Sequence, residues 1–146
     1  MLRVSGAKQR RWSKELYERA VEFHGHGGPF MIAGLRMGLT ALERLDAKGW
    51  FHINCTVELK WEPPDSCVID GIQSSTGCTM GKGNIGVLEG EGVSAEFTKG
   101  EERLRMTLIE GVLDEMRRAA EAGGEEAGAL MSGLIEAEVS ELFELS

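Results

Sequence analysis

The sequence contains little of what secreted, membrane-spanning or nucleic-acid-binding proteins need. Its 146 residues include only three cysteines, an odd number without regular spacing, so we expect no disulfide framework of the kind that supports small secreted domains. No uncharged apolar stretch approaches the roughly 18 residues of a membrane-spanning helix. With 24 acidic against 16 basic residues, the net charge of -8 repels phosphate backbones, and no Lys/Arg stripe offsets it. These absences favour a cytoplasmic protein without a nucleic-acid or membrane partner.

The length suits one compact domain with its own hydrophobic core. Residues 1–12 include four basic side chains, but no apolar run follows them, as a secretory signal would require. We therefore expect residues 1–146 to form a single domain in which residues 1–12 are a mobile basic arm.

The first part of the chain has the periodicity of α-helices. Ser13 can cap a first helix that Gly25 ends, and Pro29 suits the first turn of a second helix that runs to about Leu45. Small residues recur on one side of this second helix, so another backbone can approach it closely. These residues are Gly34, Gly38 and Ala41.

The middle of the chain alternates in the manner of β-structure. Apolar and polar residues alternate over residues 51–60, which predicts a half-buried strand that Pro63-Pro64 ends. A short helix to about Ser75 should follow, and then three strands that tight turns join into a meander, at about residues 85–89, 93–99 and 103–109. The expected fold is α+β: two N-terminal helices, a mixed or antiparallel sheet of about four strands with an inserted short helix, and C-terminal helices over about residues 112–142.

Two distant segments concentrate residues that can bind metals or act as nucleophiles. Residues 24–30 read His-Gly-His-Gly-Gly-Pro-Phe, and residues 66–84 read Ser-Cys-Val-Ile-Asp-Gly-Ile-Gln-Ser-Ser-Thr-Gly-Cys-Thr-Met-Gly-Lys-Gly-Asn. Imidazole nitrogen and thiolate sulfur are ligands that suit zinc. The two segments therefore predict a divalent metal site, with zinc as the favoured ion and His24, His26, Cys67 and Cys78 as its ligands.

The two histidines have a second interpretation. His24 falls at the end of the first helix, and His26 lies in the junction that follows. Imidazoles at such a junction can point into a cleft, where they can bind a metal or transfer a proton. Alternatively, His24 only caps the helix, because a helix C-terminus favours a cation. The sequence leaves both interpretations open.

The cysteines also have two interpretations. Cys67 is expected in the first turn of the short helix, where free N–H groups lower the pKa of a thiol, and Asp70 lies one turn further on the same face. These two residues are the catalytic candidates, although Asp70 could equally satisfy a backbone group. If the helix is continuous, Cys78 lies about 12 Å or more from Cys67, so one ion can bind both only if the loop folds back or a second copy of the chain contributes a thiol. All three cysteines, Cys55 above all, could instead be small buried apolar residues.

The glycine-rich stretch at residues 77–83 differs from a phosphate-binding P-loop. Only three residues separate Gly77 from Gly81, and Gly83 follows the lysine where a P-loop has serine or threonine. A general anion site aided by Lys82 is one interpretation, and a tight loop that glycine tolerates is the other. The binding candidates around this loop are Gln73, Gly77, Thr79 and Lys82.

The same two segments carry a resemblance to a known family. The pattern His-Gly-His-x-x-Pro at residues 24–29, followed by Cys-Val-Ile-Asp-Gly-Ile-Gln-x-x-x-Gly-Cys-Thr-x-Gly-Lys-Gly-Asn at residues 67–84, resembles the E-subunit family of molybdenum- or tungsten-dependent formylmethanofuran dehydrogenase. The resemblance implies an α+β core that dimerises, a metal or active site at these segments, and a link to the one-carbon metabolism of methanogens and related anaerobes. The residues that carry over are His24, His26, Cys67, Asp70, Gln73, Gly77, Cys78, Thr79 and Lys82.

Two departures from the family pattern bear on the site. Gly28 occupies the position before the proline where the family commonly has a cysteine, and no cysteine follows Cys78, so the C-terminal zinc finger of many members is missing. Three functions remain open: a metal-binding accessory subunit of the dehydrogenase, an independent thiol and histidine enzyme, or a metal-free structural homodimer. The apolar faces of the second helix and the C-terminal helices predict a homodimer with the site near the subunit boundary.

Overall fold

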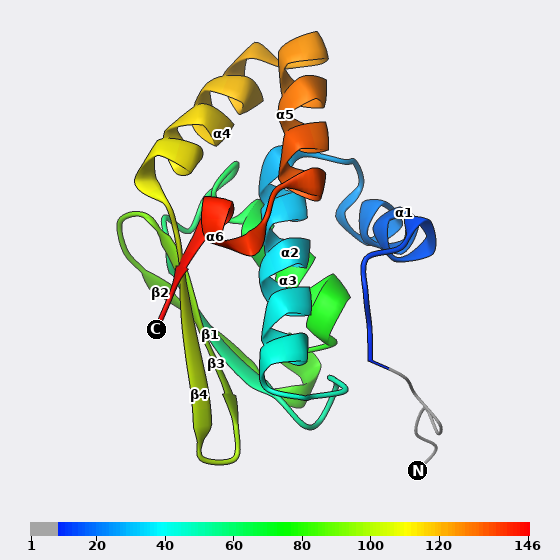
Figure 1. Cartoon of the computed structure of the whole chain (residues 1–146), viewed down its shortest axis with the longest axis vertical. Helices are drawn as coiled ribbons and strands as arrows, with labels where there is room; N and C mark the ends of the chain where they lie inside the picture. Colours follow the sequence, from blue (N-terminus) through cyan, green and yellow to red (C-terminus); the bar gives the residue numbers. More distant parts are fainter. Residues whose placement is uncertain (1–8) are drawn as a thin grey trace.

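The computed structural model describes residues 9–146 (Figure 1). Most of the predicted basic arm, residues 1–8, lies outside this range. The next two residues pack against the domain: Gln9 donates a hydrogen bond to the Ala47 carbonyl, and the Arg10 guanidinium donates to the Ser75 carbonyl and lies over the Trp50 ring.

The elements follow the predicted order closely. Ser13 caps α1 through a hydrogen bond from the Leu16 N–H, and Gly25 ends it in the left-handed region. The helices are α1 (Lys14–His24), α2 (Pro29–Arg44), α3 (Cys67–Thr76), the 3-10 turn η1 (Met80–Lys82), α4 (Glu110–Ala122), α5 (Gly124–Glu136) and α6 (Val139–Leu142). The strands are β1 (Asn54–Leu59), β2 (Ile85–Glu89), β3 (Val93–Lys99), β4 (Glu102–Leu108) and β5 (Phe143–Leu145). The α+β fold predicted from the sequence is thus confirmed.

The sheet order differs from the predicted meander. The five strands are arranged β2-β1-β3-β4-β5, and β2 pairs in parallel with β1 instead of pairing with β3. Only β3 and β4 form the predicted hairpin, and β3 pairs antiparallel with β1. The predicted meander is wrong because β1 lies between β2 and β3. The short connection from β2 to β3 contains glycine, which allows it to pass the end of β1. The sequence also missed β5, which pairs with β4 at the far edge.

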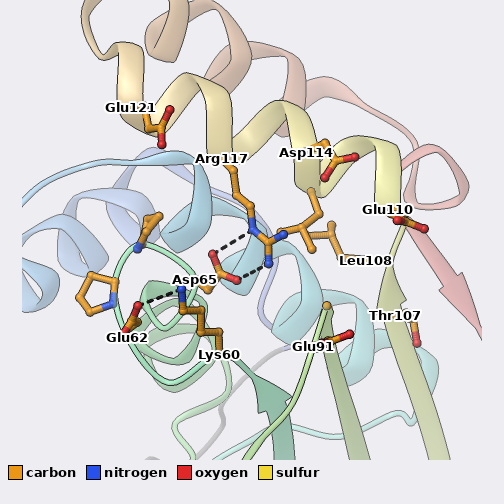
Figure 2. Close-up of a pocket in the computed structure, with 14 residues that line it drawn as sticks. Lys60, Glu62, Asp65, Glu91, Thr107, Leu108, Glu110, Asp114, Arg117 and Glu121 are labelled. Atoms are coloured by element: carbon orange, nitrogen blue, oxygen red, sulfur yellow. Dashed lines mark hydrogen bonds and ion pairs between the residues drawn. The ribbon is translucent and has the colours of Figure 1, made fainter.

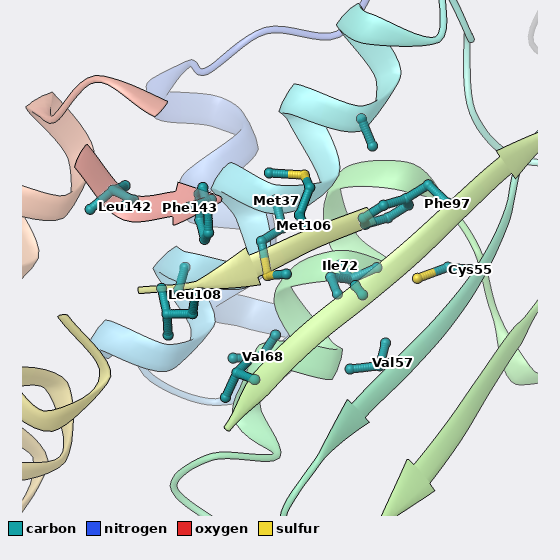
Figure 3. Packing of buried hydrophobic residues seen from close by; sticks show 14 of the residues in the cluster. Met37, Cys55, Val57, Val68, Ile72, Phe97, Met106, Leu108, Leu142 and Phe143 are labelled. Atoms are coloured by element: carbon teal, nitrogen blue, oxygen red, sulfur yellow. The ribbon is translucent and has the colours of Figure 1, made fainter. Parts of the chain in front are cut away.

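The core lies between one face of the sheet and helices α2 and α3, with α1 on the side of these helices away from the sheet (Figure 1). Alternate residues of β1 are buried, among them Cys55 and Val57, which meet Val68 and Ile72 of α3 in this core (Figure 3). Cys55 is therefore a buried apolar residue, as one of the two interpretations expected.

Helices α2 and α3 touch backbone to backbone. A Cβ atom at Gly34 would overlap the Val68 carbonyl oxygen, and one at Gly71 would overlap the Met31 carbonyl oxygen. The small-residue face of α2 is therefore covered by α3 of the same chain, and it is not free for a second copy. No helix among residues 9–146 is long and apolar enough to cross a membrane.

The replacement Gly71→Ala should lower the free energy of unfolding by about 2 kcal/mol or more, because neither backbone can withdraw from the added methyl group. Gly133→Ala in α5 is the matched control, since a Cβ there meets open space and should raise stability by up to about 1 kcal/mol. Urea unfolding followed by circular dichroism measures both. Equal effects of the two replacements would contradict the close α2–α3 contact.

Candidate functional site

His24 and Asp70 form the centre of the site. His24 ends α1, Asp70 lies in the first turn of α3, and His24 Nδ1 is 2.5 Å from Asp70 Oδ2. The His24 side chain is only 9% exposed, and its second ring nitrogen, Nε2, is buried without a hydrogen-bond partner among residues 9–146. The ring is therefore fixed through one nitrogen and offers the other, so His24 does more than cap its helix.

Cys67 shares two cavities with His24. The first, which we call the Trp61 cavity, has a volume of about 560 Å³ and is also lined by Asp70 and Gln73. The second, which we call the α2 cavity, has a volume of about 500 Å³ and is bounded by the start of α2 and by the α4–α5 hairpin. His24 and Cys67 thus lie where the two cavities meet.

The thiol of Cys67 does not have the lowered pKa that its place at a helix N-terminus predicted. Burial raises its pKa, and the carboxylates of Asp70 and Asp65 raise it further. Desolvation and two neighbouring negative charges together outweigh the partial positive charge of the helix end. Cys67 is therefore a thiol and not a thiolate near neutral pH.

His26 lies beside this centre. Its ring centroid is 4.7 Å from that of His24, and its Nδ1 donates only to the neighbouring Gly27 carbonyl oxygen. A Cβ atom at Gly28 would lie 3.3 Å from His26 Cε1, so the cysteine that the family pattern has at this position would stand next to His26. His24, His26 and Cys67 all line the α2 cavity.

Cys78 lies away from these three residues. It is fully buried, its thiol donates to the Ile53 carbonyl oxygen at 3.5 Å, and it lines neither cavity. Burial raises its pKa. The structure therefore does not bring Cys78 into either cavity that Cys67 lines. Among residues 9–146, no three His, Cys, Asp or Glu side chains already converge as a metal cage.

The glycine-rich loop satisfies its own polar groups. Thr79 Oγ1 accepts hydrogen bonds from the Lys82 ammonium at 2.8 Å and from the Lys82 N–H at 3.3 Å. Asn84, which the sequence analysis did not single out, accepts from the Thr79 N–H and donates to the carbonyls of Trp50 and Ile53. These bonds explain the loop as a tight structural turn. The loop ends in a glycine followed by an asparagine, a pair that is typical of turns, so the sequence does contain a signal for this structure.

A larger cavity than these two, about 790 Å³, lies elsewhere, between the end of β1 and α4 (Figure 2). Its main interaction joins the buried carboxylate of Asp65 to the Arg117 guanidinium at 2.7 Å. This pair fixes α4 to the segment that precedes α3. The cavity contains none of the predicted site residues.

Comparison of the sequence with known proteins identifies its family. A probable S-adenosyl-L-methionine-binding protein of Archaeoglobus fulgidus is 38% identical over 73 residues, which cover 46% of this chain and 19% of that protein. The chain therefore corresponds to less than a fifth of that relative's length. Residues 23–144, from the end of α1 to β5, match the family model described as FmdE, molybdenum formylmethanofuran dehydrogenase operon. Because this match includes both motif segments and nearly all of the fold, the chain belongs to the FmdE family.

Proposed function

We propose that this protein is a metal-binding accessory protein of the formylmethanofuran dehydrogenase type, linked to one-carbon metabolism. The observation that carries the proposal is the buried Nε2 of His24, which has no partner in the part of the chain that the structure describes. Histidines that bind metals typically donate their other ring N–H to a carboxylate, and here Asp70 lies in that position. Cys67 and His26 are the further ligands within the same cavity.

Zinc suits this donor set because it accepts both nitrogen and sulfur. With Gly28 in place of the family cysteine and Cys78 in the core, three protein ligands remain, which is the number that catalytic zinc sites use. A zinc ion bound there would supply a Lewis acid with an open position. Asp70 would orient His24 for this role.

An independent thiol enzyme fits the site less well. A cysteine nucleophile needs a lowered pKa, whereas the pKa of Cys67 is raised. The sequence also has no cysteine series of the type that holds iron–sulfur clusters. These features support an accessory role beside dehydrogenase subunits that carry the redox chemistry.

Zinc titration should show one ion per chain, with His24→Ala abolishing binding and Asp70→Asn weakening it by about 10- to 100-fold. Cys55→Ala is the control and should leave the affinity unchanged, because Cys55 lies in the core. Since Cys67 must lose a proton to bind zinc and its pKa is raised, binding should release protons and weaken as the pH falls. Protein that takes up no zinc after purification without chelator would refute the proposal in favour of the metal-free structural homodimer.

The replacement Gly28→Cys should tighten zinc binding by about tenfold or more, because it places a fourth donor beside His26. The Gly28 backbone is extended and accepts a side chain, and the exposed His26 ring can shift by the few tenths of an ångström required. Gly81→Cys is the control, since it adds a thiol on an open surface outside the α2 cavity. Equal gains for both variants would show that the added thiol acts without His26.

We also propose that the protein is a homodimer joined through β2. This strand is at one edge of the sheet, and it has neither lysine nor proline to prevent pairing. An antiparallel pair centred on Val87 would place the exposed Leu88 of each copy opposite Gly86 of the other. Such pairing is self-complementary, as a two-fold interface requires.

Light scattering should give twice the chain mass of 15.9 kDa at micromolar concentration. Leu88→Lys should yield a monomer, because it places a charge at the centre of the paired edge. Phe23→Lys, which changes another exposed apolar residue on α1, should leave the dimer intact. A wild-type monomer would refute the dimer, and a dimer that persists in Leu88→Lys would refute its β2 interface.

A further inference from the structure

The Trp61 cavity is bordered by one face of α3. Four residues at the start and middle of this helix line the cavity and follow the spacing i, i+3, i+4 and i+7, which places them on a single helix face. They are Ser66, Ile69, Asp70 and Gln73. The side chains of Asp70 and Gln73, one helical turn apart, therefore point toward this cavity and form a polar strip along it.

This polar strip has hydrogen-bonding capacity that the fold does not use. Asp70 contacts His24 through Oδ2, whereas its Oδ1 has no partner among residues 9–146. The Asp70 side chain is 36% exposed, and of the three cavities it lines only the Trp61 cavity, so its accessible oxygen faces that space. The side-chain amide of Gln73 likewise forms no hydrogen bond within the described range. The strip can thus offer two acceptor oxygens, one from each side chain.

The charges around the cavity favour a cation. Asp70 is the only Asp or Glu among residues 9–146 that lines it, and no Lys or Arg of this range does so. The carboxylate therefore meets a bound cation without a competing ammonium or guanidinium in the cavity wall. The net charge of -8 also attracts cations toward the molecule.

The remaining wall is largely apolar and contains an aromatic side chain. Ile85 and Val87 alternate along β2 and so lie on the same face of the sheet. Trp61 and Met80 complete this wall, and Trp61 is 55% exposed although it is a large aromatic residue. Its backbone N–H donates to the Glu89 carboxylate, which holds the tryptophan beside the end of β2. The cavity volume of about 560 Å³ suits a small organic molecule.

We infer that the Trp61 cavity binds a primary amine in its ammonium form, with an aromatic body. The ammonium group donates to Asp70 Oδ1 and to the Gln73 amide oxygen, and the body packs on Trp61 and the apolar wall. A primary ammonium has three donors and no acceptor, which matches a strip of two acceptors. This inference goes beyond the proposed function, because it requires neither zinc nor Nε2 of His24.

Calorimetric titration of the full chain with phenethylamine, at neutral pH and without added metal, tests the inference. Phenethyl alcohol has the same ring without the charge, and it should bind about tenfold or more weakly. The trimethylated ammonium analogue keeps the charge but has no N–H donor, and it should also bind about tenfold more weakly. Equal binding of either analogue would overturn the inference.

Replacements in the cavity locate the binding. Asp70→Asn removes the carboxylate charge and should weaken phenethylamine binding by about tenfold, whereas Asp46→Asn makes the same change on an exposed residue outside the cavity and should have no effect. Trp61→Leu should weaken binding by about threefold or more, and Phe23→Leu, at an exposed aromatic residue of α1 that lines none of the three cavities, is its control. Equal effects within either pair would overturn the inference.

Gln73→Leu separates the two proposals, because it removes an acceptor without touching His24. It should weaken phenethylamine binding and leave binding of the neutral alcohol and zinc affinity unchanged. Full phenethylamine affinity in this variant would contradict the role of Gln73 and overturn the inference. A wild-type chain that binds phenethylamine but takes up no zinc would overturn only the proposed function.

Discussion

The direct contact between the backbones of α2 and α3 is the constraint on which the site depends. Gly34 and Gly71 meet there, and Gly71 follows Asp70 in the sequence. Any side chain between the helices would push α3 outward and carry Asp70 away from His24. The glycines therefore set the position of a carboxylate on one helix relative to an imidazole at the end of another. Their role in the site is exerted entirely through packing.

The α4–α5 hairpin completes the site from the opposite side, and two arginines hold it. Arg36 of α2 donates to the carbonyls of Leu134, Ile135 and Ala137 at the end of α5. Arg117 of α4 pairs with the buried Asp65 just before α3. Both anchors join the hairpin to α2 and to the segment before α3, and residues of all these parts line the α2 cavity. The two sides of the cavity are therefore held together by hydrogen bonds and an ion pair as well as by packing.

The sequence predicted what local interactions decide. Ser13, Gly25 and Pro29 mark helix ends through their own backbone preferences, and the observed bounds of α1 and α2 follow them. Strand order could not be predicted in this way, because whether β1 inserts between β2 and β3 depends on residues far apart in the chain. The same holds for the site. His24 and Asp70 were identified separately, but their pairing across 46 positions is tertiary. The thiol of Cys67 was misjudged because burial and Asp65 are invisible in the helix pattern.

The place of His24 in the last turn of α1 links ligand binding to the dynamics of that helix. Helix α1 is attached through a small apolar cluster in which Ala20 of α1 packs against Met31 and Leu35 of α2, separate from the main core. Helix ends and peripheral elements open locally at a lower free energy than the core. A ligand that bound both His24 and Cys67 would require α1 in its docked position, so it would add its binding free energy to the cost of opening this helix. Amide hydrogen exchange along α1 would then slow as the ligand binds.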